Sequence, residues 1–138
     1  MKVINAKNKV LGRLCTEIAS TLLREQGKII VVNAGDVIIT GTKENIIHKF
    51  QERTHKKGKG NPQKNAKYPR YPDKLVKFAV RGMLPRNARG NLALKKLRVY
   101  IDVPETYQKD LPKEAELSKH NGMKLSDICV LLGAKLKN

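Results

Sequence analysis

The sequence has few of the residues that mark several common classes of protein. It contains no Trp, and aromatic residues make up only 4% of its 138 residues. Cys15 and Cys129 have no second cysteine or histidine at a metal-ligand spacing, so we expect buried, reduced thiols instead of a metal site. No apolar run reaches the roughly 18 residues that cross a bilayer, and no signal-peptide core follows Met1. These absences argue against a membrane partner and favour a cytoplasmic protein.

Patterns that support catalysis are also lacking. His48, His55 and His120 have no nearby carboxylate pair with which to form an acid–base site. Gly12 is the only glycine after the first expected strand, which is too little for a dinucleotide fingerprint or a P-loop. We therefore predict no enzyme activity, no cofactor, no metal and no small-molecule substrate.

Acidic residues are almost missing from the middle of the chain. The whole sequence has 29 Lys and Arg against 12 Asp and Glu, a formal net charge of +17. Residues 53–98 hold fifteen basic residues and one acid, Asp73, and so carry +14 of that charge. A protein with this charge repels itself unless a polyanion neutralises it. Nucleic acid is the expected polyanion, and residues 53–98 are expected to meet it.

The spacing of apolar residues predicts a single α/β domain over residues 1–138. A strand at 1–5, a helix at 11–23 closed by Gly27, and a continuous β-branched strand at 28–33 imply a right-handed crossover and a parallel sheet. The other expected elements are a strand at 37–39, a helix opened by Thr40–Thr42 and running through Phe50, a helix from Pro72 to Gly82, a helix at 91–96, a strand at 97–101, a polar helical turn at 113–119, and a helix from Ser126 to Gly133.

Two basic segments within residues 53–98 are candidates for contact with nucleic acid. Residues 54–72 are rich in Lys, Gly and Pro, and we expect them to stay out of the core and to be mobile until RNA orders them. The alternative for this segment is a disordered linker or a solvated face. Residues 80–90 alternate three arginines with two glycines and a proline, a pattern that favours a structured phosphate clamp over an ordinary basic connection between helices.

Each predicted contact follows from side-chain chemistry. Guanidinium groups form paired hydrogen bonds with phosphate, lysines neutralise the RNA backbone, tyrosines stack on bases, and glycines let the protein backbone approach closely. The candidate RNA-binding residues are Arg13, Lys43, His55, Lys56, Lys57, Lys59, Lys64, Lys67, Tyr68, Arg70, Tyr71, Lys74, Arg81, Gly82, Met83, Arg86, Asn87, Arg89, Gly90, Lys95 and Lys96.

Several ordered blocks resemble the L-thirteen family of large-subunit ribosomal proteins. The sequence from Ala79 to Asn87, AVRGMLPRN, is similar to the signature of that family almost residue for residue. Leu11–Leu14, Val31–Ala34, Thr40–Lys43 and Lys96–Tyr100 agree in the same order, so that the resemblance spans about residues 3–100. The chain departs from the bacterial branch after the last expected strand, in a way that resembles an archaeal member.

The resemblance implies a fold, a partner and a location. The fold is a three-layer α/β/α domain around a mainly parallel four-stranded sheet, with a basic loop insertion and a C-terminal helical extension at 102–138. The partners are large-subunit rRNA and neighbouring ribosomal proteins, with the chain a monomer within the large ribosomal subunit, where it supports assembly and translation. Two alternatives stay open on the residues alone: a small Rossmann-like enzyme acting on nucleotides or RNA, and an RNA-binding regulator outside the ribosome.

Overall fold

The computed structural model describes residues 1–25, 27–56, 58, 60, 61, 63, 67–108, 111 and 121–136. Lys57, Lys59 and Lys64 of the candidate set lie outside these residues, as do His120 and the helical turn expected at 113–119. The mobility expected for residues 54–72 falls partly on this undescribed portion of the chain.

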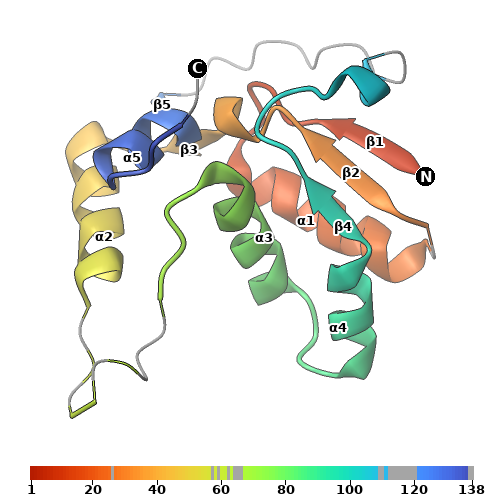
Figure 1. Cartoon of the computed structure of the whole chain (residues 1–138), viewed down its shortest axis with the longest axis horizontal. Helices are drawn as coiled ribbons and strands as arrows, with labels where there is room; N and C mark the ends of the chain where they lie inside the picture. Colours follow the sequence, from red (N-terminus) through yellow and green to blue (C-terminus); the bar gives the residue numbers. More distant parts are fainter. Residues whose placement is uncertain are drawn as a thin grey trace.

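A parallel sheet forms the centre of the fold. Its strands β1 (Lys2–Asn5), β2 (Ile29–Val32) and β4 (Leu97–Val99) lie in the order β1-β2-β4, and both pairings are parallel (Figure 1). All four residues of β2 are buried, as their uninterrupted β-branched pattern predicts. Helix α1 (Leu11–Arg24) connects β1 to β2. The predicted crossover and the α/β class are confirmed.

The expected fourth strand of this sheet pairs elsewhere. Strand β3 (Ile38–Thr40) joins β5 (Gly122–Lys124) in an antiparallel pair, and in the described residues a single bridge, from Val10 to Ile38, links β3 to residues outside that pair. The 3-10 turn η1 (Ala34–Asp36) leads the chain from β2 into β3. In the described residues the parallel sheet therefore has three strands and not four. Local sequence could not show this, because the partner of β3 lies about eighty residues away.

The helices gather on one face of the sheet. Helix α1 packs against α3 (Pro72–Met83) and α4 (Ala88–Lys95), and all three share one apolar core with Ile29, Val31 and Leu97. Figure 1 shows α1 behind the strands with α3 and α4 beside it. Helices α2 (Lys43–His55) and α5 (Leu125–Leu131) pack next to the β3–β5 pair, and the expected three-layer order stays a prediction.

The C-terminal helix α5 (Leu125–Leu131) contributes to the core. Leu125, Ile128 and Cys129 of α5 are almost fully buried and belong to the same apolar cluster as α1 and the sheet. Helix α5 begins at Leu125, one residue before the predicted Ser126. Gly133, with φ of +84°, follows it in the left-handed conformation that ends a helix, as predicted. The C-terminal helix expected within residues 102–138 is thus present as α5, and it packs over the fold.

Two residues predicted to cap helices do not form the expected caps. Helix α1 ends at Arg24, where the chain leaves through an extended Glu25 whose N–H donates to the Thr21 carbonyl, so Gly27 does not cap it. Thr42 occupies the position before α2, but its side chain accepts no capping hydrogen bond. Pro72, in contrast, is the first residue of α3 as predicted, because its ring fixes a helical φ and the missing N–H is not needed there.

The buried cysteines give a testable consequence. Burial raises the pKa of Cys15 and of Cys129 to about 12 from 9.0, so both thiols stay protonated at neutral pH. Because the thiolate is the nucleophile, Ellman's reagent at pH 8 should label neither thiol in the folded protein and both in guanidinium chloride. Stability should fall as pH rises from about 9 towards 12, since only the unfolded thiols ionise there. Rapid labelling of the native protein would contradict the packing of α1 or α5.

Candidate nucleic-acid interface

Helix α3 places the first candidate residues by burying its opposite side. Val76 and Val80 are fully buried, and this orientation leaves Lys74 and Arg81 exposed, as the predicted apolar stripe requires. Phe78 is an apolar residue of the same helix, yet it is 47% exposed. Its position on the flank of the helix makes it a surface aromatic that the sequence pattern did not identify.

The turn after α3 is held by residues of the Arg/Gly motif itself. Asn87 precedes α4, and its side-chain oxygen accepts a hydrogen bond from the Gly90 N–H at 2.9 Å, which caps that helix. A Cβ added at Gly90 would overlap the Pro85 carbonyl oxygen. Gly90 is therefore needed for packing within the protein, and Asn87 for capping. The predicted contacts of these two residues with RNA stay predictions.

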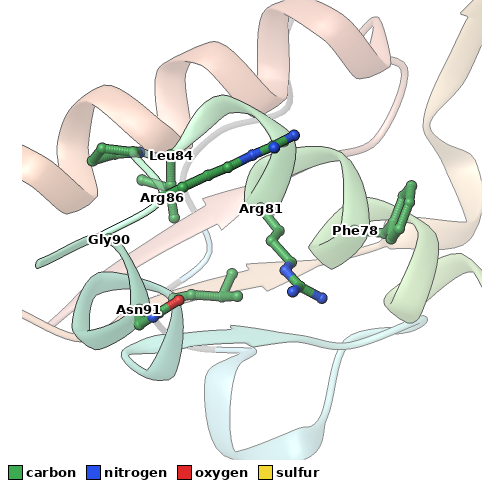
Figure 2. A pocket seen from close by; sticks show the side chains of 9 residues that line it. Phe78, Arg81, Leu84, Arg86, Gly90 and Asn91 are labelled. Carbon is green, nitrogen blue, oxygen red and sulfur yellow. The ribbon is translucent and has the colours of Figure 1, made fainter. Parts of the chain in front are cut away.

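An open groove lies between α3, this turn and α4. Its volume is about 550 Å³. The lining residues are Phe78, Arg81, Gly82, Leu84, Pro85, Arg86, Gly90, Asn91 and Leu94. Figure 2 shows the side chains of Arg81 and Arg86 leaving the backbone in different directions around this groove. The structure thus brings four predicted residues, Arg81, Gly82, Arg86 and Gly90, to one site.

The charges at the groove have no neutralising partner among the described residues. Arg81 and Arg86 are exposed, and within the ranges that the structure describes neither forms a hydrogen bond or an ion pair. Gly82 has no heavy atom within 4 Å of the position that a Cβ would take, so nothing inside the fold explains a glycine there. Arg89 differs, because its guanidinium donates to the Leu23 carbonyl at 3.0 Å and closes the end of α1.

The two tyrosines of the basic segment have different surroundings. Tyr68 is half-buried, with its ring edge-on to Phe50 at 6.0 Å and to Phe78 at 5.3 Å, so this part of residues 54–72 does reach the core. The guanidinium of Arg53 lies 5.8 Å from the Tyr68 ring centre. Tyr71 is 37% exposed, with the Lys74 ammonium 5.4 Å from its ring centre. Tyr71 is the better placed of the two for stacking on a base.

The remaining candidates are dispersed over the surface. Lys95 and Lys77 line a shallow hollow that Arg81 shares, next to the groove. Met83 is 44% exposed at the end of α3, and its sulfur accepts from the Thr16 hydroxyl. Exposed candidates on other elements are Arg13 on α1, Lys43 and His55 at the two ends of α2, and Lys56, Lys67 and Arg70 between α2 and α3; Lys96, after α4, is partly buried.

Five residues that line the groove were not among the candidates: Leu84 and Pro85 lie within the Arg/Gly motif, and the other three lie outside it. Phe78, Asn91 and Leu94 line the groove, although none belongs to the Arg/Gly motif. The available signal was helical spacing, since Phe78 precedes Gly82 by one turn and Asn91 precedes Leu94 by nearly one turn. That signal does not distinguish a groove wall from a core stripe, so the sequence alone could not have identified them.

The carboxyl end of the parallel sheet, where α/β enzymes bind ligands, is occupied by internal contacts. The Asn5 side-chain oxygen accepts from the Asn33 amide at 2.8 Å and from the Lys7 N–H. Lys124 donates to the Asp36 carboxylate at 2.9 Å, a hydrogen bond that raises the pKa of Lys124. Among the residues with described positions, no cluster of His, Cys, Asp or Glu could hold a metal ion, and no helix is long and apolar enough to cross a membrane.

Known proteins are similar in sequence to this chain, and some of them are matched over nearly their whole length. The family model described as ribosomal protein L13 matches residues 1–106. The large ribosomal subunit protein uL13 of Methanocaldococcus jannaschii is 37% identical over 98% of the chain and 99% of its own length, and that of Methanococcus maripaludis is 38% identical over the same shares. The uL13 protein of Sulfurisphaera tokodaii is 42% identical over 77% of the chain and 73% of its own length. The groove and its arginines thus lie inside the matched region of a chain that belongs to the ribosomal protein L13 family, with archaeal relatives.

Proposed function

We propose that the chain is a structural component of the large ribosomal subunit that binds rRNA through the surface around α3 and α4. One observation carries the proposal: Arg81 and Arg86 flank a single groove without any acidic partner in the described residues. Guanidinium groups without an acidic partner, on a protein of net charge +17, favour binding to a polyanion. Phosphate is suited to them because two of its oxygens can accept hydrogen bonds from two N–H groups of one guanidinium. Family membership supports the large subunit as the location of that polyanion.

The proposal includes the wider surface and the other partners. Lys74, Tyr71, Lys77 and Lys95 extend the basic surface beside the groove, and the lysines of residues 54–72 would neutralise further RNA backbone. Contacts of this kind read the shape of folded RNA and not its base sequence. The chain would act as one domain and as a monomer, next to other ribosomal proteins.

Location in the ribosome has a direct test that separates this proposal from a free regulator. After sucrose-gradient sedimentation of a cell extract, nearly all copies of the chain should travel with large subunits at physiological salt. A large pool that stays near the top of the gradient would instead indicate a role away from the ribosome.

Salt dependence tests the many-phosphate interface. Each neutralised phosphate releases condensed counterions, so affinity for large-subunit rRNA should fall by about three orders of magnitude or more between about 50 and 200 mM KCl. Filter binding of the purified chain to large-subunit rRNA, repeated across salt concentrations, gives the slope. Binding that is almost independent of salt would exclude this interface.

Charge removal tests the two groove arginines. Arg81→Gln or Arg86→Gln should weaken rRNA binding and reduce the slope of log affinity against log salt by about one, because each change removes one phosphate contact. Arg98→Gln is the matched control, since Arg98 is exposed on strand β4 away from the groove. Equal losses for all three variants would show that only total charge matters and would contradict a localised site.

The two glycines should separate folding from binding. Gly82→Ala should raise the free energy of unfolding by up to about 1 kcal/mol, because alanine favours a helix and has free space there, yet weaken rRNA binding. Gly90→Ala should lower stability by about 1–3 kcal/mol, because its Cβ overlaps the Pro85 carbonyl. Urea denaturation and filter binding measure the two effects. Unchanged binding by Gly82→Ala would remove Gly82 from the interface.

A further inference from the structure

We infer that the groove between α3 and α4 receives one nucleotide whose base has left the RNA stack, with the base in the groove and its flanking phosphates on Arg81 and Arg86. This inference rests on the proposed function and adds the ligand of the groove. A surface that only neutralises phosphates needs no hollow, whereas here the arginines surround one. The volume of about 550 Å³ lies in the range of pockets that hold small organic ligands.

One side of the groove is suited to the face of a base. Phe78 lines the groove and is 47% exposed, so part of its ring is accessible to a ligand there. Tyr68 contacts it edge-on at 5.3 Å and so restrains the ring. Leu94 and Pro85 complete an apolar lining. Every base has a π-face, so such a wall accepts an unstacked base of any identity.

Polar groups at the groove match the rest of a nucleotide. The Asn91 side chain is exposed at the groove and has no hydrogen-bond partner in the described part of the chain, so its amide can donate to and accept from a base edge. Arg81 and Arg86 lie on the same rim, with free guanidinium groups for phosphate oxygens. Gly82 lets the RNA backbone approach the end of α3. The groove combines an apolar wall, an amide and two cations. This combination is complementary to a whole nucleotide and not only to a phosphate.

Footprinting of the full chain on large-subunit rRNA tests the inference. Hydroxyl radicals report the protected riboses, and two base reagents report base edges that are not paired: dimethyl sulfate modifies adenine and cytosine, and a carbodiimide modifies uracil and guanine. Within the ribose footprint of the unmodified chain, we expect at least one unpaired base to be protected from these reagents. Asn91→Phe, which fills the groove from α4, should restore the reactivity of that base while the ribose footprint keeps its extent. Asn45→Phe, an exposed position on α2, is the control and should leave the protection intact.

A second variant guards against a folding defect. Gly82→Leu fills the groove from α3, where an added Cβ meets no heavy atom within 4 Å, and it should remove the same base protection. The nucleotide pocket would be overturned if the unmodified chain gave a ribose footprint in which neither variant removed any base protection. That result would leave the proposed function standing. No ribose footprint with the unmodified chain would overturn the proposed function itself. The two failures are thus distinguishable.

Discussion

The burial of one side of helix α3 is the constraint on which the interface depends. Val76 and Val80 are fully buried in the core that α1 and the sheet share, so the rotation of α3 about its axis is fixed. This rotation places Phe78 and Arg81, which are not on the buried side of the helix, at the surface. Burying an apolar side chain of this size contributes about 1.5–3 kcal/mol. This contribution stabilises the orientation of α3 in which Arg81 is exposed.

The Arg/Gly motif divides into residues that build the turn and residues that the turn presents. Asn87 caps α4, Gly90 allows contact with the Pro85 carbonyl, and Arg89 closes the end of α1. The close approach of Gly90 to Pro85 belongs to the turn between α3 and α4, and both residues line the groove. Arg81, Gly82 and Arg86 make no comparable contact in the described residues. The motif predicted to be one phosphate clamp therefore contains residues that hold the turn and residues that are exposed at its surface.

The sequence predicted the parts of the fold that local periodicity controls. The stripe of α1, the continuous β2 strand and Pro72 at the start of α3 each follow from spacing or from one residue's geometry. Non-local features escaped it. The pairing of β3 with β5 and the packing of α5 into the core depend on contacts between distant segments, and Tyr68 enters the core through Phe50 and Phe78. At the site, charge and motif indicated the arginines, but the groove needs two helices placed side by side.

The arrangement of ion pairs shows how the fold separates its charges. Ion pairs between described residues join Lys2 to Glu25, Lys9 to Glu17 and Lys124 to Asp36, and a protonated His48 would pair with Glu52. These pairs are exposed, so each adds little stability. Arg81 and Arg86 have no such acidic partner among the described residues, so a polyanion that neutralises their charge gains affinity.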